Sequence, residues 1–233
     1  MEIYSVKILD INEEKLNKLC LSIDSNKKSR IQKFHNKEDK IRTLIGEILI
    51  RTIIIKELDI RNNNIKFAQN QYNKPYLKSH TQFNFNISHS GRYVLCAVDN
   101  KPIGIDVEEV KPIDYKNIVK RFFYVSESNY IFNQKAEFEL NKFYEIWTLR
   151  ESYVKCCGKG LSMSLKSFYI EIDKYKNIKV ISRNKYKEHV FKIFNIGLNY
   201  KIAICSLNNN VSNKIITVDQ NRLIDNYFRL NIK

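Results

Sequence analysis

Apolar residues recur at helical spacing in two long stretches of the chain. From Glu38 to Leu58 they repeat every three or four positions, which predicts an amphipathic helix. A second long helix is expected over residues 137–156, with Gly158 as its C-terminal cap. Shorter helices are expected over 12–22, where Asn12 would be the N-cap, and over 114–122 and 126–134.

Other segments have the apolar character and turn boundaries of strands. Residues 93–98 and 103–108 are two such runs, and the Asp99-Asn100-Lys101-Pro102 sequence between them has turn chemistry, so we predict a hairpin. Further strands are expected over 3–9, 167–172, 189–196, 200–206 and 214–218.

A long helix accompanied by strands therefore occurs in both halves of the chain. We predict an α+β fold: a pseudo-dimer of two similar α+β subdomains, each with a long helix packed on a small antiparallel sheet. The N-terminal subdomain would span residues 1–102 and the C-terminal one residues 103–233, with their interface near residues 100–112. No flexible linker separates the halves, so we expect one packed unit.

The charge balance adds a constraint on partners. The 233 residues include 40 Lys and Arg against 25 Asp and Glu, a formal net charge of +15. Such an excess attracts an anion, which could be a nucleic acid, a membrane surface, a phosphorylated small molecule or an acidic protein. Charge alone does not distinguish these.

The sequence also bears on compartment. Its first residues contain no cationic segment followed by an apolar core, and the apolar stretch 48–55 is interrupted by Arg51 and far shorter than the roughly 20 residues of a membrane span. Five cysteines, an odd number without CxxC spacing, predict reduced and mostly buried thiols. Adjacent Cys156 and Cys157 could hardly both ligate one zinc ion from a helix. We expect a soluble cytoplasmic protein that does not enter a membrane.

Candidate chemistry begins with the segment Gly104-Ile105-Asp106-Val107-Glu108. On a strand, Asp106 and Glu108 project to the same side, roughly 6.5–7 Å apart along the strand. Two carboxylates on one face repel each other unless a cation lies between them, and hard oxygen ligands suit Mg²⁺. The alternative is a solvated strand face that happens to carry two acids.

A second group of residues lies on the predicted helix around Trp147. Trp147, Glu151 and Lys155 are spaced by four and share a helix face, with Arg150 at its side. The Glu–Lys pair could be an ordinary surface contact worth a few tenths of a kcal/mol. It could also complete a metal site, supply a base and neutralise a phosphate.

A third group is the sequence Asn86-Ile87-Ser88-His89-Ser90-Gly91-Arg92. It lacks the glycine that precedes the serine in a hydrolase nucleophile elbow. Small polar donors with a histidine and an arginine suit anion contact, although a lone histidine is more often structural. Lys74 lies at the apex of a turn, which is unremarkable by itself.

Taken in order, these motifs resemble those of the 4′-phosphopantetheinyl transferases, in particular the larger, monomeric type that activates nonribosomal peptide synthetases. The family signatures (V/I)G(V/I)D and (F/W)xxKE(S/A)xxK correspond to residues 103–106 and 147–155. The likeness covers most of residues 1–170. Two positions depart from the pattern: Arg150 replaces a Lys, and Asn73 stands where the family often has Gly. We expect both to be tolerated, since Arg keeps the positive charge of Lys and Asn can adopt the left-handed conformation.

The resemblance implies an enzyme that uses coenzyme A and Mg²⁺, with Mn²⁺ as a substitute, to move phosphopantetheine onto a serine of an apo carrier protein. It implies that Asp106, Glu108 and Glu151 hold the metal, that Lys155 meets the pyrophosphate, and that Glu151 also takes the serine proton. The residues implied around the 3′-phosphate and adenine end of coenzyme A are Lys27, Arg30, Arg42, Lys74, Ser88 and His89.

The expected partners are apo acyl or peptidyl carrier proteins with an acidic surface, which would contact residues 158–189 of a monomeric enzyme. One alternative is a basic nucleic-acid-binding module, which accounts for the net charge but gives Asp106 and Glu108 no purpose. Another is an inactive carrier-binding scaffold, which would require the loss of a catalytic carboxylate. We therefore expect no nucleic-acid partner.

Overall fold

The structure is a computed structural model that describes residues 1–182 and 188–232. Its first half contains three helices and five strands in the order β1 (Glu2–Lys7), α1 (Glu13–Leu21), α2 (Ser25–Gln32), α3 (Lys37–Leu58), β2 (Phe67–Gln69), β3 (Pro75–Leu77), β4 (Asn84–Ser90) and β5 (Tyr93–Asp99), with a short 3₁₀ turn at Asn62–Asn64.

The second half begins with a strand and ends by returning to the first half. Its elements are β6 (Ile103–Glu109), α4 (Tyr115–Phe122), α5 (Val125–Phe132), α6 (Ala136–Cys157), β7 (Phe168–Ile172), β8 (Ile178–Ser182), β9 (Val190–Asn195), β10 (Tyr200–Ser206), β11 (Ile216–Val218) and α7 (Gln220–Ile232), with 3₁₀ turns at Gly160–Ser162 and Leu165–Ser167.

The predicted long helices are confirmed, and their ends have identifiable causes. The Asn36 side chain caps α3 by accepting a hydrogen bond from the Glu38 backbone N–H at 2.8 Å. Asn12 caps α1 in the same way, accepting from the Lys15 N–H at 2.9 Å. At the end of α6, Gly158 adopts φ 67°, the left-handed conformation in which a C-terminal glycine ends a helix.

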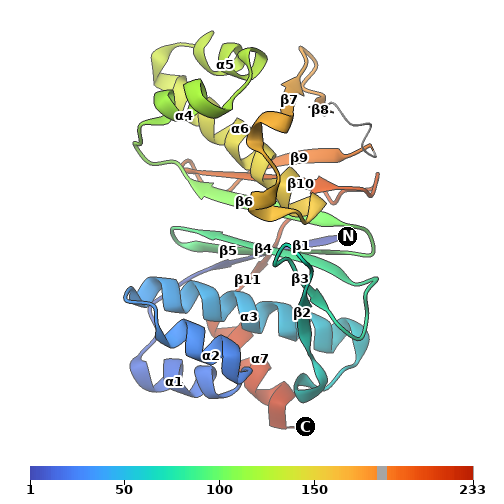
Figure 1. The fold of residues 1–233 in the computed structure, drawn as a ribbon. Helices are drawn as coiled ribbons and strands as arrows, with labels where there is room; N and C mark the ends of the chain where they lie inside the picture. The colour runs from blue at the N-terminus through green and yellow to red at the C-terminus, as the bar shows by residue number, and fades with distance from the viewer. Residues whose placement is uncertain (183–187, 233) are drawn as a thin grey trace.

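Figure 1 shows the two halves stacked with their sheets together at the centre and their long helices outside. The larger sheet has the order β11-β1-β5-β4 and the facing one the order β6-β10-β9. Side chains alternate along β5, so Leu95 and Ala97 pack toward the facing sheet while Val94 and Cys96 pack toward α3. The molecule is thus the predicted pseudo-dimer of α+β halves.

The last elements differ from the predicted division at residues 102 and 103. β11 pairs in parallel with β1, with Tyr4 opposite Ile216, so it completes the sheet of the first half. Leu223 and Ile224 of α7 are buried in the same apolar cluster as α3. Residues 216–232 therefore pack with the N-terminal half, as the red segment below the central sheets in Figure 1 shows.

The predicted hairpin between residues 93–98 and 103–108 is wrong. β5 pairs with β1 and β4, whereas β6 pairs with β10. The turn residues instead join the two sheets: the Asp99 carboxylate accepts hydrogen bonds from the Ser206 hydroxyl at 3.1 Å and the Asn208 amide at 3.1 Å.

Among the described residues, no helix has the length and apolarity that crossing a bilayer requires.

Candidate active site

A cavity of about 340 Å³ opens where β4, β6 and α6 meet, between the two halves. It brings together six of the predicted site residues, which come from segments far apart in the sequence. Ile87 and Trp147 form its apolar walls. The polar lining consists of Ser88, His89, Asp106, Glu108, Glu151 and Lys155.

β4 is joined to β6 through side chains rather than through a backbone ladder. Three polar side chains of β4, spaced by two, each accept a hydrogen bond from a backbone N–H of β6. The distances are 2.8 Å from Ile105 N–H to Asn86 Oδ1, 3.3 Å from Val107 N–H to Ser88 Oγ, and 3.1 Å from Glu109 N–H to Ser90 Oγ. This spacing follows from the period of two in each strand, and it fixes the register between the halves.

The same two serines orient the acids. Ser88 donates to Asp106 Oδ1 at 3.0 Å, and Ser90 donates to Glu108 Oε2 at 2.9 Å. Each hydroxyl therefore accepts from the β6 backbone and donates to a β6 carboxylate. Asp106 and Glu108 face the same cavity, as their spacing on a strand predicts.

Lys155 connects α6 to this arrangement. Its Nζ donates to Asp106 Oδ1 at 2.6 Å and to Ser88 Oγ at 3.0 Å. The close approach of α6 to β6 depends on Gly104. A Cβ at that position would lie 2.0 Å from the Ser152 carbonyl oxygen and 2.4 Å from the Cys156 nitrogen, both of them backbone atoms.

Burial and mutual repulsion disfavour the charged forms of the three cavity carboxylates, Asp106, Glu108 and Glu151. Burial raises the pKa of Asp106 above its usual range despite the Lys155 ammonium. Burial and the Asp106 charge raise the pKa of Glu108 to about 7, and the same two causes raise the pKa of Glu151. Within the described part of the chain, Asp106 Oδ2 is buried without a hydrogen-bond partner. An all-oxygen donor set with an unpartnered buried oxygen fits a hard divalent cation such as Mg²⁺.

A second cavity of about 710 Å³ lies on the other side of Ile87, which lines both cavities. Lys27 and Arg30 of α2 line the second cavity, together with Asn73 and Pro75 of the turn before β3. The Lys27 ammonium is 2.5 Å from a Glu47 carboxylate oxygen. Asn73 has φ 66°, so it adopts the left-handed conformation expected of it.

Two of the basic residues predicted to surround coenzyme A, Lys74 and Arg42, line neither cavity. Lys74 donates to the carbonyl oxygens of Lys155 at 2.7 Å and Ile103 at 3.0 Å, and burial lowers its pKa. Arg42 donates to the Gly91 carbonyl at 2.7 Å and forms ion pairs with Glu38 and Asp39. The Arg42 charge also affects His89: burial lowers the pKa of that imidazole most, and the nearby Arg42 guanidinium lowers it further.

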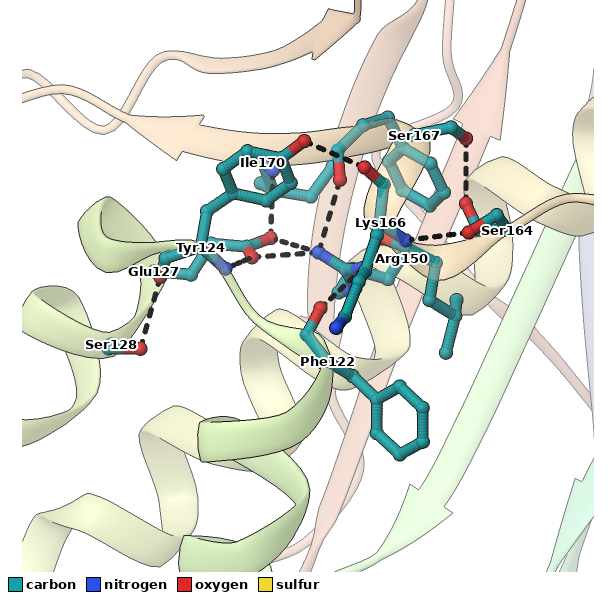
Figure 2. Close-up of polar contacts among 11 residues, drawn as sticks. Phe122, Tyr124, Glu127, Ser128, Arg150, Ser164, Lys166, Ser167 and Ile170 are labelled. Atoms are coloured by element: carbon teal, nitrogen blue, oxygen red, sulfur yellow. Dashed lines mark hydrogen bonds and ion pairs between the residues drawn. The ribbon is translucent and has the colours of Figure 1, made fainter.

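Arg150 does not join the face that carries Glu151. It is fully buried and does not line the cavity. Its guanidinium donates to both oxygens of buried Glu127, at 2.6 and 2.7 Å (Figure 2). The rings of Phe123 and Phe168 lie 4.9 and 4.8 Å from the guanidinium carbon. The departure from the family pattern at this position therefore concerns packing rather than the cavity.

Three residues that matter for the geometry were not among the predicted site residues. Asn86 and Ser90 share the interstrand role of Ser88, and their alternation along β4 is a sequence signal that identifies them. Glu127 has no comparable signal, since its partner Arg150 is 23 residues away.

Comparison with known proteins agrees with this description. A family model described as "4′-phosphopantetheinyl transferase, N-terminal" matches residues 11–101, and one described as "4′-phosphopantetheinyl transferase superfamily" matches residues 102–208. The chain is 32% identical to 4′-phosphopantetheinyl transferase Sfp of Bacillus subtilis (strain 168), over 96% of this chain and 100% of the relative. It is 37% identical to 4′-phosphopantetheinyl transferase gsp of Aneurinibacillus migulanus, over 94% and 91% of the two chains.

A solved holo-(acyl-carrier-protein) synthase from Bacillus anthracis, described in complex with CoA (3′,5′-ADP), covers 45% of this chain and 93% of its own. Its TM-score is 0.40 and its sequence identity 18%.

Proposed function

The chain belongs to the 4′-phosphopantetheinyl transferase superfamily, and we propose that its reaction takes place in the cavity between β4, β6 and α6. It is an enzyme that transfers the 4′-phosphopantetheine group from coenzyme A to a serine of an apo carrier protein. The observation that carries the location is the convergence of Asp106, Glu108, Glu151 and Lys155 on one cavity.

Asp106, Glu108 and Glu151 would hold Mg²⁺ or, with the same oxygen donors, Mn²⁺. When bound, the ion supplies positive charge to the pyrophosphate of coenzyme A and relieves the repulsion among these carboxylates. The raised pKa values and the unpartnered Asp106 oxygen support this assignment. Ser88 and Ser90 keep the acids on the cavity side of β6.

In the reaction, the carrier serine oxygen attacks the phosphorus that carries the pantetheine arm. The bond from that phosphorus to the adenosine 3′,5′-bisphosphate oxygen breaks, and the serine proton passes to Glu151. Lys155 is assigned to the pyrophosphate, where it stabilises the charge that develops on the leaving oxygens. Glu151 is assigned the base role because its carboxylate lines the same cavity as the metal-holding acids and Lys155.

Coenzyme A would extend from this cavity into the adjoining one past Ile87. Ser88 and His89 are assigned to its phosphates, and Lys27 and Arg30 to its 3′-phosphate and adenine end. Arg42 and Lys74 belong to the predicted cofactor set, and we assign them an indirect role because they hold Gly91 and the end of α6.

We further propose that the carrier protein presents an acidic surface to the region around residues 158–189, of which residues 183–187 lie outside the described part. The net charge of +15 and the fully exposed Leu161 side chain support this docking region. Both halves of one chain supply the site, so a monomer suffices. Five free thiols suit a reducing, cytoplasmic setting.

The test of the site is single-turnover transfer by Glu151→Gln at saturating Mg²⁺ and coenzyme A across pH, measured as the mass gained by an apo carrier. A general base contributes about 10²–10⁴-fold, so the variant should be slower by that factor and lack one ionisation of the wild type. The control is Glu137→Gln, an exposed position on the same helix. A near-wild-type rate for Glu151→Gln would remove the base role and leave the enzyme's activity intact.

A further inference from the structure

A second cluster of reactive side chains lies at the end of α6, and none of its members lines the cavity. It consists of Cys156 in the last turn of α6, Cys205 in β10 and His189 just before β9. One ligand atom from each residue lies within 4.8 Å of the others. We refer to these three residues as the thiol–imidazole cluster. Neither the family resemblance nor the proposed reaction gives it a role.

The surroundings of the cluster are closed and partly apolar. Cys156 and Cys205 are 3% and 0% exposed, while His189 is half-buried and borders the outside. The His189 ring packs edge-on against Tyr153, with 5.0 Å between ring centroids. Its Nδ1 is buried and has no hydrogen-bond partner among the described residues. A buried imidazole nitrogen without a partner, on a ring that lies beside two thiols, is an unexplained polar group.

We propose that Cys156, Cys205 and His189 bind one Zn²⁺ ion, with a water molecule as the fourth ligand. Two thiolates, a neutral imidazole and Zn²⁺ have no net charge together, which suits a buried position. In tetrahedral zinc sites the Zn–S and Zn–N distances of about 2.3 and 2.0–2.1 Å separate the ligand atoms by about 3.6–3.8 Å. The observed separations need to contract by roughly 1 Å at most.

The protonation of the cluster agrees with the geometry for Cys156, whereas burial raises the pKa of the Cys205 thiol well above its usual range, so that thiol loses its proton only when the metal binds. A hydrogen bond with Cys205 and the neighbouring His189 lower the pKa of Cys156 to about 6. Despite burial, the thiols of Cys156 and Cys157 raise the pKa of His189 to about 9. The cluster therefore contains a thiolate near neutral pH, and the thiolate is the form of cysteine that ligates metals. Binding of Zn²⁺ releases two protons from the three side chains.

The position of the cluster indicates what the ion would do. Cys156 directly follows Lys155, and the Lys74 ammonium already holds the carbonyl of Lys155. An ion at the cluster would tie the end of α6 to β10 and to the start of β9. It would thus stabilise the backbone that carries Lys155 without touching the reacting groups.

The experiment measures zinc in the full-length protein. Purified reduced protein is incubated with ZnCl₂ in excess Mg²⁺, which competes for the carboxylate site, and then desalted. We expect about one zinc per chain by elemental analysis. Zinc should also protect Cys156 and Cys205 from alkylation in wild-type protein, as read by peptide mass mapping, a measurement that depends on no variant.

Matched variants locate the ion. Cys205→Ser and His189→Ala should weaken zinc binding at least 100-fold in competition with a chromogenic chelator, and Cys96→Ser, another buried cysteine, should not. In the Co²⁺-substituted protein, the thiolate charge-transfer band should lose at least half of its intensity in Cys156→Ser, because one of the two thiolate ligands is removed. Zinc retained equally by all variants, no retained zinc, or a Cys156–Cys205 disulfide in protein purified without reductant and refractory to zinc would each overturn the proposal.

Discussion

Replacing Arg150 by Met removes one partner of a fully buried ion pair. The guanidinium donates to both oxygens of Glu127 (Figure 2) and also to the carbonyl of Leu165. Without it, a carboxylate with no exposed surface lacks its counter-charge. Breaking a buried pair in this way destabilises proteins by about 3–5 kcal/mol. For a chain of this size, each kcal/mol lowers Tm by about 2–4 °C, so Tm should fall by roughly 6–20 °C.

A double-mutant cycle measures the interaction energy between Arg150 and Glu127 apart from the contacts that each makes with other residues. Glu127→Gln keeps the shape of the side chain, but its single amide oxygen can accept from only one of the backbone N–H groups of Tyr124 and Ile170, which donate to different carboxylate oxygens of Glu127 at 2.9 Å each. The double variant Arg150→Met/Glu127→Gln contains no uncompensated charge, so its loss should be smaller than the sum of the single losses by about 0.5–3 kcal/mol.

The assay is urea unfolding followed by circular dichroism, with exposed Arg121→Met as a control that should stay within about 0.5 kcal/mol of wild type. Activity measured well below Tm should change less than stability, because Arg150 does not line the cavity. A loss below about 1 kcal/mol in Arg150→Met, or additive losses in the cycle, would refute this account of the pair.

The remaining predictions concern the cavity. Asp106→Ala should lower kcat/KM at least 100-fold, about 3 kcal/mol of transition-state stabilisation, and full activity in excess EDTA would count against the metal assignment. Without divalent cation, Glu108 has a pKa of about 7 in the folded chain against 4.5 normally, so the folded state holds the proton more tightly. The free energy of unfolding should therefore fall as pH rises from about 4.5 to 7, and saturating Mg²⁺ should remove that fall in a Tm–pH profile. A Tm–pH profile that Mg²⁺ leaves unchanged would contradict the assignment of Glu108 as a metal ligand. Gly104→Ala should lower Tm and kcat together, because its Cβ would meet the Ser152 carbonyl at 2.0 Å; unchanged values of both would show that α6 has room to move.

Periodicity identified the elements whose apolar positions are numerous and regular. α3 and α6 were predicted to within one residue or two, since each has a long series of buried side chains, from Ile41 to Ile54 in α3 and from Phe143 to Cys156 in α6. α2 was not predicted, because its sequence is mostly polar and Ile31 is its one apolar residue. It is a helix because Asp24 caps it and Ile31 reaches the core.

Strand partners were harder to predict than strands. The turn residues after β5 indicated a local hairpin, but β6 is paired with β10, about a hundred residues later. For the site, the spacing of Asp106 and Glu108 correctly predicted that both face one cavity. Lys74 shows the opposite case. The family resemblance implied that it lies near the 3′-phosphate and adenine end of coenzyme A, whereas the fold surrounds its ammonium with carbonyl oxygens that no local pattern reveals.

The pairing of β11 with β1 has a consequence for the order in which the protein is made. The sheet of the first half cannot be completed until residues 216–218 have been synthesised, long after Tyr4 has left the ribosome. At roughly 5–20 residues per second, the interval is about 10–40 s. During it, the surface of α3 that later contacts Leu223 and Tyr227 remains uncovered. β10 ends at Ser206, so the β6–β10 sheet has all of its strands about 0.5–2 s before β11 is made. The second half of the chain is therefore able to form its sheet before the first half has all of its strands.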